Sequence, residues 1–129
     1  MLRLKALDHV GLKVTDMDRT LRFYCQALGL ELLRRLDRAG GVTVAVLRVG
    51  NQELNIFSRA DFASSHRDDD PAGLDHFCLE IESITTDELV ASLRRSGVEL
   101  AKGPQKRRDG TSYFVDDPDG CRVELIVKT

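Results

Sequence analysis

The sequence lacks any run of apolar residues long enough to cross a membrane. A transmembrane helix needs about 20 consecutive apolar residues, and no stretch of this 129-residue chain approaches that length. The residues from Met1 to Leu4 lead directly into a strand-like pattern, without the apolar segment and cleavage site of an export signal. We therefore expect a single cytoplasmic domain with one compact core and no membrane partner.

Cysteine is too sparse for a disulfide framework or a thiolate metal site. The three cysteines, Cys25, Cys78 and Cys121, are odd in number, and no two have C-x-x-C spacing. That spacing is typical of zinc-binding and redox motifs. We expect three reduced thiols, as is usual in the cytosol.

The chain also lacks an excess of positive charge. Its formal net charge is −2, which does not favour the broad basic surface that nucleic-acid binding requires. Nucleic acid is therefore not an expected partner. A local basic cluster of Lys102, Lys106, Arg107 and Arg108 is typical of a solvated turn and, less often, of an anion-binding group at the mouth of a pocket.

The chain contains one sequence pattern that occurs twice. Leu-Asp-His occurs at Leu7 and again at Leu74, Gly-X-Glu-Leu occurs at Gly29 and again at Gly97, and Glu-Leu recurs near the end of each half. A repeat of about half the chain indicates two structural modules. We place module one at 4–58 and module two at 74–128, joined by a polar linker at 59–73.

Each module has the pattern of a strand, a helix and three further strands. Apolar residues alternate at 10–14 and at 77–81, which predicts an opening strand in each copy. Asp16 is a candidate helix cap, and Thr85 with Glu88 has capping-box spacing. The remaining strands are predicted at 30–36, 42–49 and 52–57 in module one, and at 98–101, 111–115 and 122–127 in module two.

Strand parity singles out four side chains that turn away from the apolar core. Successive residues of a strand point to opposite faces, and in four strands the apolar set leaves one His or Glu on the other face: His9, Glu53, His76 and Glu124. Any one of them alone would be an ordinary solvent-facing residue. Four together, placed twice by the repeat, predict ligands for one divalent metal ion, because imidazole and carboxylate donors suit Zn, Ni, Co, Mn or Fe(II).

These residues lie in segments that resemble the vicinal oxygen chelate superfamily, the glyoxalase, bleomycin-resistance and extradiol-dioxygenase group. The segments are LDHVGLKV, FYCQALGLEL, LDHFCLEI and YFVDDPDGCRVELI, and they span nearly the whole chain. The resemblance implies an α+β fold in which two βαβββ modules form a curved, mostly antiparallel eight-stranded half-barrel around a central cavity. It also implies a homodimer.

The four-ligand set is similar to that of glyoxalase I. The resemblance therefore implies a metal-dependent glyoxalase-type lyase or isomerase that acts on a small vicinal-oxygen substrate through an enediolate, with Glu124 and Glu53 as the catalytic carboxylates. Lys13 falls where glyoxalase I has a substrate-binding Arg, and Lys106 resembles its loop Lys. Phe57 shares the face of Glu53 and would line the cavity, but it stands where glyoxalase I has a glutathione-contacting Asn, so the use of glutathione stays open.

Two alternatives are open at this point. His9, His76 and Glu124 also match the three ligands of an iron(II) extradiol dioxygenase. The bleomycin-resistance branch of the same superfamily instead implies a metal-free protein that sequesters a ligand without chemistry. The presence of Glu53 favours the lyase or isomerase.

Overall fold

A computed structural model describes residues 2–3, 5–59, 61–62 and 74–129. Most of the predicted linker at 59–73 lies outside these residues. Module one contains β1 (His9–Val14), α1 (Met17–Leu21), a π-helical continuation η1 (Arg22–Ala27), β2 (Glu31–Arg38), β3 (Val42–Val49) and β4 (Gln52–Ser58). Module two contains β5 (Phe77–Ile81), α2 (Thr86–Arg95), β6 (Lys102–Arg107), β7 (Gly110–Asp116) and β8 (Arg122–Lys128).

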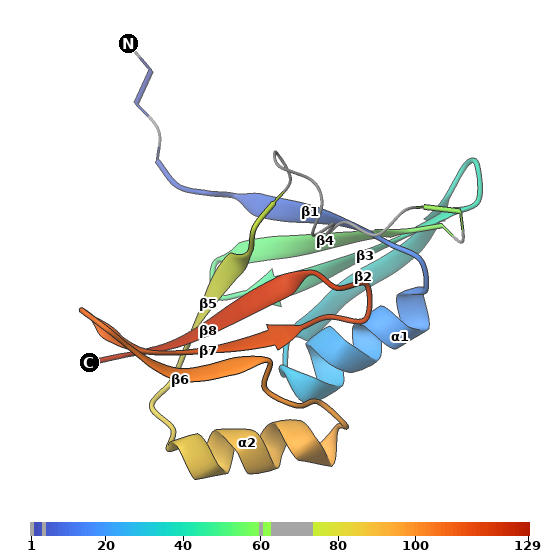
Figure 1. Cartoon of the computed structure of the whole chain (residues 1–129). Coiled ribbons are helices and arrows are strands. Elements are labelled where there is room, and N and C mark those ends of the chain that lie inside the picture. Colours follow the sequence, from blue (N-terminus) through green and yellow to red (C-terminus); the bar gives the residue numbers. More distant parts are fainter. Residues whose placement is uncertain (1, 4, 60, 63–73) are drawn as a thin grey trace.

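The strands form two four-stranded mixed sheets of identical topology. Their orders are β1-β4-β3-β2 and β5-β8-β7-β6. The pairs β1–β4 and β5–β8 are parallel, and the other pairs are antiparallel. Figure 1 shows α2 along the lower side of the second sheet and α1 beside the two sheets. The predicted α+β class and the two βαβββ units of a half-barrel are confirmed.

Both helices begin at the capping residues that the sequence indicates. The Asp16 carboxylate accepts a hydrogen bond from the Arg19 amide at 2.9 Å at the start of α1. Thr85 and Glu88 form both hydrogen bonds of a capping box at the start of α2. Beyond the second helix, Gly97 has a φ of 74°, a left-handed conformation that glycine adopts without steric penalty.

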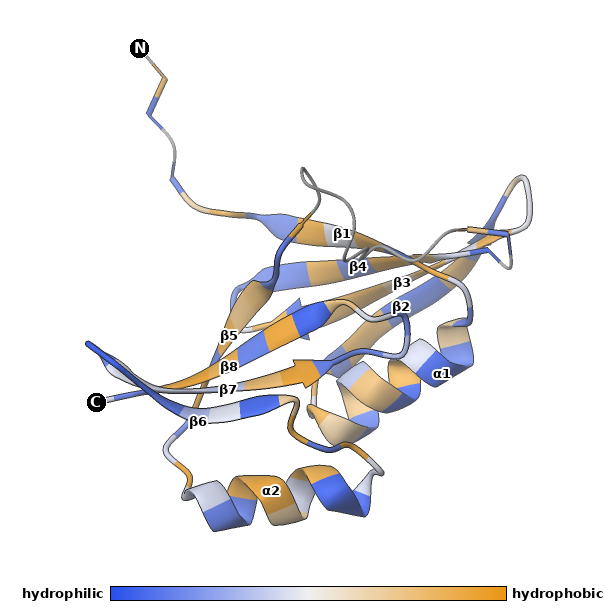
Figure 2. Cartoon of the chain, in the orientation of Figure 1, coloured by the Kyte–Doolittle hydropathy of each residue, from blue (hydrophilic) through white to orange (hydrophobic). Residues whose placement is uncertain are grey.

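The core is one apolar cluster that includes both modules. Leu12 and Ile56 from the first sheet, Leu93 from α2, and Val123 and Leu125 from the second sheet all belong to it. Figure 2 shows the alternation that makes this possible, as successive apolar and polar bands along β8. One face of each sheet therefore packs into the core. The opposite face carries polar side chains together with further buried apolar residues, such as Val46 beside Asn55 and Phe114 beside Glu124.

The predicted strand at 98–101 is wrong. The strand that pairs with β7 is β6, which begins at Lys102, directly after the predicted range, and has Gln105 opposite Ser112. Val98 and Leu100 pack against the core from the preceding loop, so their apolar character reflects burial and not strand pairing. β6 is a charged edge strand, as is common for strands that must resist pairing with other molecules, and its polar composition gave no strand signal.

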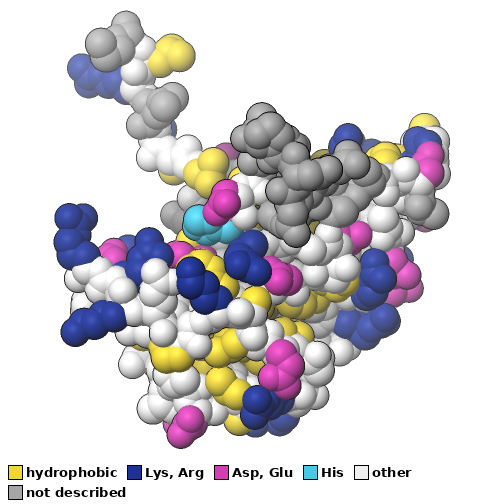
Figure 3. Space-filling model, in the orientation of Figure 1, with side chains coloured by type: hydrophobic (Ala, Val, Ile, Leu, Met, Phe, Trp, Pro, Cys, Tyr) yellow, Lys and Arg dark blue, Asp and Glu magenta, His cyan; other side chains and the backbone are white. Residues whose placement is uncertain are grey.

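No helix among the described residues is both long and apolar enough to span a membrane. The face shown in Figure 3 carries basic and acidic side chains interspersed with one another.

Candidate metal centre

His9 and Glu53 lie side by side on adjacent strands. β1 and β4 run parallel, and their register pairs these two residues, so both side chains project from the same face of the sheet. The His9 side chain is 50% exposed. Both residues line a cavity of about 300 Å³ whose other wall includes Phe77 and Cys78 from β5. The first predicted ligand pair therefore opens onto the edge of module two.

His76 and Glu124 form the second pair. The His76 Nε2 lies 3.9 Å from the Glu124 Oε1, and the Glu124 side chain is only 6% exposed. Cys78 pairs with Glu124 in the β5–β8 register. Burial, together with a hydrogen bond to Glu124 and its negative charge, raises the pKa of the Cys78 thiol to about 12. Cys78 is therefore a neutral neighbour of the carboxylate at physiological pH.

Arg107 reaches the same carboxylate, although the sequence analysis named it only as a member of the basic cluster and not as a site residue. Its Nη1 lies 3.2 Å from the Glu124 Oε1. In the β6–β7 register Arg107 pairs with Gly110, which lies on the Glu124 face of the sheet, whereas Lys106 pairs with Thr111 and faces the other way. Lys106 and Arg107 both line a pocket of about 470 Å³ that does not include Glu124. The register and the ion pair place Arg107, and not Lys106, beside Glu124.

Each predicted histidine ligand is also held by the aspartate that precedes it. The His9 Nδ1 lies 2.8 Å from the Asp8 Oδ2, and the His76 Nδ1 lies 2.6 Å from the Asp75 Oδ2. The Leu-Asp-His repeat contained this signal, because both aspartates recur with the histidines. Its structural meaning could not be read from strand parity, which places neighbouring side chains on opposite faces.

Lys13 and Phe57 lie together, as two members of the predicted substrate site. They are partners in the β1–β4 register and line a hollow of about 480 Å³ with Phe62. The Lys13 Nζ lies 5.4 Å from the centroid of the Phe62 ring, within the range of a cation–π interaction. Gly11 lies on the same face, and a Cβ built there would be 3.4 Å from the Phe57 ring. Arg38 lines the same hollow, which therefore offers two cations and two aromatic rings to a ligand.

The donor set fits a divalent ion in its chemistry and in the spacing of one pair. Two ligands at about 2.1 Å from a metal lie at most about 4.2 Å apart, so the 3.9 Å between His76 and Glu124 is compatible with a shared ion. Within the described part of the chain, however, no three His, Cys, Asp or Glu side chains form a group that could hold one ion. The described residues of one chain therefore supply two separate sets of candidate ligands, one His and one Glu from each module.

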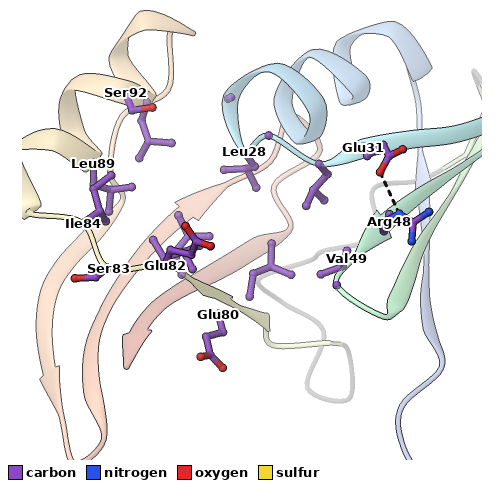
Figure 4. Close-up of a pocket in the computed structure, with 18 residues that line it drawn as sticks. Leu28, Glu31, Arg48, Val49, Glu80, Glu82, Ser83, Ile84, Leu89 and Ser92 are labelled. Carbon is purple, nitrogen blue, oxygen red and sulfur yellow. Dashed lines mark hydrogen bonds and ion pairs between the residues drawn. The ribbon is translucent and has the colours of Figure 1, made fainter. Parts of the chain in front are cut away.

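A larger cleft lies between the modules and contains none of the predicted site residues. Its volume is about 690 Å³. Figure 4 shows Leu28 and Val49 on the module-one side, facing Ile84 and Leu89 from module two, with the Glu31–Arg48 ion pair at its rim. The predicted site is thus not the most voluminous hollow of the chain.

Comparison with known proteins places the fold in a family. Residues 6–125 match the family model of the Glyoxalase/Bleomycin resistance protein/Dioxygenase superfamily. The chain belongs to this superfamily. The resemblance inferred from the four sequence segments is thereby confirmed, and its match covers both modules.

Similar proteins in the superfamily include named lyases. The chain is 33% identical to a probable lactoylglutathione lyase of Synechocystis, with 93% of each chain covered. It is 29% identical to a lactoylglutathione lyase of Neisseria meningitidis, with 95% of this chain and 90% of that one covered. A glyoxalase family protein from Enterococcus faecalis has a similar structure, with a TM-score of 0.78, 28% identity and coverage of 95% and 97%. These similarities support a glyoxalase-type activity at the level of the family, which also includes bleomycin resistance proteins.

Proposed function

We propose that this chain is a metal-dependent glyoxalase-type lyase or isomerase that acts on a small substrate with oxygen atoms on adjacent carbons. The observation that carries the proposal is the His76–Glu124 pair, in which an imidazole nitrogen and a buried carboxylate oxygen lie 3.9 Å apart. The repeat supplies a matching pair in module one, where His9 stands beside Glu53. The similarity to lactoylglutathione lyases supports this class of reaction.

We assign His9, Glu53, His76 and Glu124 as the ligands of one divalent ion. Two nitrogen and two oxygen donors suit Zn, Ni, Co, Mn or Fe(II). Among the described residues of one chain, no three His, Cys, Asp or Glu side chains lie close enough to hold one ion. The proposal therefore includes a homodimer, in which the His–Glu pair of module one in one protomer meets the His–Glu pair of module two in its partner. The partial exposure of both imidazoles, 50% for His9 and 37% for His76, leaves them accessible to such a partner.

The reaction requires a proton to move between adjacent carbons without net oxidation. A bound divalent ion would supply Lewis acidity to the two substrate oxygens. Glu124 is the base that takes the proton from the carbon beside the carbonyl, and its burial excludes competing water. Glu53 is the second carboxylate, assigned to return a proton to the neighbouring carbon.

The substrate is assigned to the faces of the two sheets that carry the four proposed ligands. Lys13 would bind an anionic group, with Phe57 against its apolar part, since both line the 480 Å³ hollow. Lys106 stays a second candidate for an anionic group, in its separate pocket. Arg107 is added to this set because its guanidinium already lies beside Glu124.

Metal content and solvent proton exchange test the proposal. Protein purified without chelators should contain a divalent ion. It should also incorporate deuterium from D₂O into 2-oxoaldehyde adducts of thiols, glutathione among them. Glu53→Ala and Glu124→Ala should each lower both quantities at least about tenfold, whereas Glu82→Gln, an exposed carboxylate outside the site, should change neither.

Three results would overturn the proposal. Unchanged metal content in both alanine variants would remove the ligand assignment. A wild-type protein that binds small molecules without metal or turnover would be a sequestering protein of the bleomycin-resistance type. Oxygen uptake with catechols by the iron-loaded protein, without proton exchange, would instead identify a dioxygenase.

A further inference from the structure

We propose that Asp8 and Asp75 are positioning residues that fix the tautomer of His9 and His76, so that the Nε2 of each ring carries the free electron pair. The inference rests on the proposed function, because it assigns this nitrogen to the metal. It concerns two residues that are not ligands, and it follows from a contact that occurs once in each module.

The geometry of each contact determines which nitrogen is protonated. The Nδ1 of His9 lies 2.8 Å from a carboxylate oxygen of Asp8, and the Nδ1 of His76 lies 2.6 Å from one of Asp75. An ionised carboxylate can only accept a hydrogen bond, so the hydrogen must be on Nδ1. A neutral imidazole carries a single N–H, and its Nε2 is then free to bind a metal.

The position of His76 shows that the free nitrogen is the useful one. It is the Nε2, and not the Nδ1, that lies 3.9 Å from the Glu124 Oε1. The His76 ring therefore contacts Asp75 through Nδ1 and lies near Glu124 through Nε2. Outer carboxylates that bind metal-ligating imidazoles in this way orient the ring and raise its basicity.

The contact is not a consequence of regular strand geometry. Neighbouring residues of a strand point to opposite faces, yet here the side chains of consecutive residues meet. Both contacts occur where a strand begins, since β1 starts at His9 and β5 starts at Phe77. The same local departure from strand geometry at both copies of the Leu-Asp-His repeat favours a shared role.

Stability gives a weaker explanation for these contacts. The Asp8 and Asp75 side chains are 91% and 93% exposed, and exposed ion pairs contribute little to folding. Their effect is therefore expected at the imidazole ring. Loss of an outer-shell partner commonly lowers metal affinity by about 10- to 100-fold, and the exposure of these carboxylates points to the lower end of that range.

The experiment measures zinc affinity and imidazole tautomer in the full chain. Zinc binding is followed by competition with a chromophoric chelator for wild type, for Asp8→Ala and Asp75→Ala, and for the isosteric Asp8→Asn and Asp75→Asn. The alanine variants should bind zinc about tenfold more weakly, and the asparagine variants should lie between them and wild type. Asp87→Asn, which removes an exposed charge at the start of α2, should match wild type.

Tautomers are read from long-range ¹H–¹⁵N correlation spectra of the metal-free protein at about pH 8.5, with rings assigned through His9→Gln and His76→Gln. Wild type should show Nδ1–H for both rings, and each alanine variant should shift its own ring towards Nε2–H. If wild type binds zinc and the alanine variants bind it equally well, the inference is wrong while the proposed function stands. A change of tautomer without a change of zinc affinity would also overturn the inference about Asp8 and Asp75. If wild type binds no zinc, the proposed function fails together with this metal role.

Discussion

Arg107 donates a hydrogen bond from Nη1 to the Oε1 of Glu124 at 3.2 Å, and the same oxygen lies 3.9 Å from the His76 Nε2. A metal ion that binds His76 and Glu124 would therefore compete with the guanidinium for one oxygen. Glu124 is nearly buried, so the pair is more than a surface contact, and a positive charge close to a divalent ion is unfavourable. Arg107 is thus expected to weaken metal binding.

The first prediction concerns this competition. Arg107→Gln should tighten zinc binding by roughly 3- to 10-fold, because the arginine no longer competes with the metal for Glu124. A charge-assisted hydrogen bond contributes about 1.5–3 kcal/mol, and the partial exposure of Arg107 reduces that contribution here. Chelator competition measures the change. Arg108→Gln, the neighbouring residue in the turn after β6, removes the same charge without the contact and should leave the affinity unaltered. Equal or weaker binding by Arg107→Gln would refute the competition.

The sequence sufficed for the fold because the fold is repeated. The match of Leu-Asp-His and Glu-Leu in the two halves located both modules, and strand parity placed His9 and Glu53 on one face, as their register now shows. β6 was not predicted, because its residues are polar or charged and it forms a strand through its pairing with β7, which the local sequence does not encode.

The candidate site was harder to read for a related reason. Parity can place a residue only when the strand boundaries are known, so the two-residue range Lys106–Arg107 could not be divided between the two faces before β6 was located. The contact between Asp75 and His76 arises where regular strand geometry has not yet begun. Whether two ligand pairs meet depends on how modules or subunits pack, and no local pattern describes that.

The second prediction concerns the link between the modules. The Tyr24 hydroxyl donates to the Asp117 carboxylate at 2.7 Å, and both side chains are buried. Tyr24→Phe should lower the free energy of unfolding by about 1.5–3 kcal/mol, since a hydrogen bond to a buried charge is lost. Tyr113→Phe is the matched control: its hydroxyl contacts the Thr86 hydroxyl at 2.7 Å, a neutral pair worth about 1 kcal/mol. Urea unfolding would contradict the prediction if the two variants lost the same stability.

The third prediction concerns the close packing of β7 on β8. A Cβ added at Gly110 would lie 2.2 Å from the Val127 carbonyl oxygen and 2.9 Å from the Lys128 Cα, so the backbone must shift. Gly110→Ala should lower the free energy of unfolding by at least about 2 kcal/mol or prevent folding. Gly11→Ala, whose Cβ would meet only the Phe57 ring at 3.4 Å, should change stability by less than about 1 kcal/mol. Thermal and urea unfolding compare the two, and a well-tolerated Gly110→Ala would show that this packing is looser than described.

The fourth prediction concerns the pH dependence that Asp117 imposes. Burial raises the pKa of its carboxyl above the ordinary value of 3.8, against the opposing effects of hydrogen bonds from Tyr24 and from the backbone amides of Cys121 and Asp119. Between 3.8 and the raised value the folded state binds more protons than the unfolded state, so the contribution of Asp117 to stability is full below pH 3.8 and declines as the pH rises through that interval. Asp117→Asn keeps an acceptor oxygen for the backbone amides and does not titrate.

The difference in unfolding free energy between Asp117→Asn and wild type isolates this group, because the other carboxyls cancel. That difference should shift in favour of the variant as the pH is raised from about 3.5 to 7, and it should be constant above the native pKa. Asp18 serves as a control of opposite sign: its contact with Arg35 lowers the pKa of the carboxyl, so the stability it contributes is lost as the pH falls. Urea unfolding at several pH values gives both curves. A flat difference for Asp117→Asn would show that the three hydrogen bonds cancel the effect of burial on the pKa. A difference that moves in the direction of Asp18→Asn would show that they stabilise the charged carboxylate.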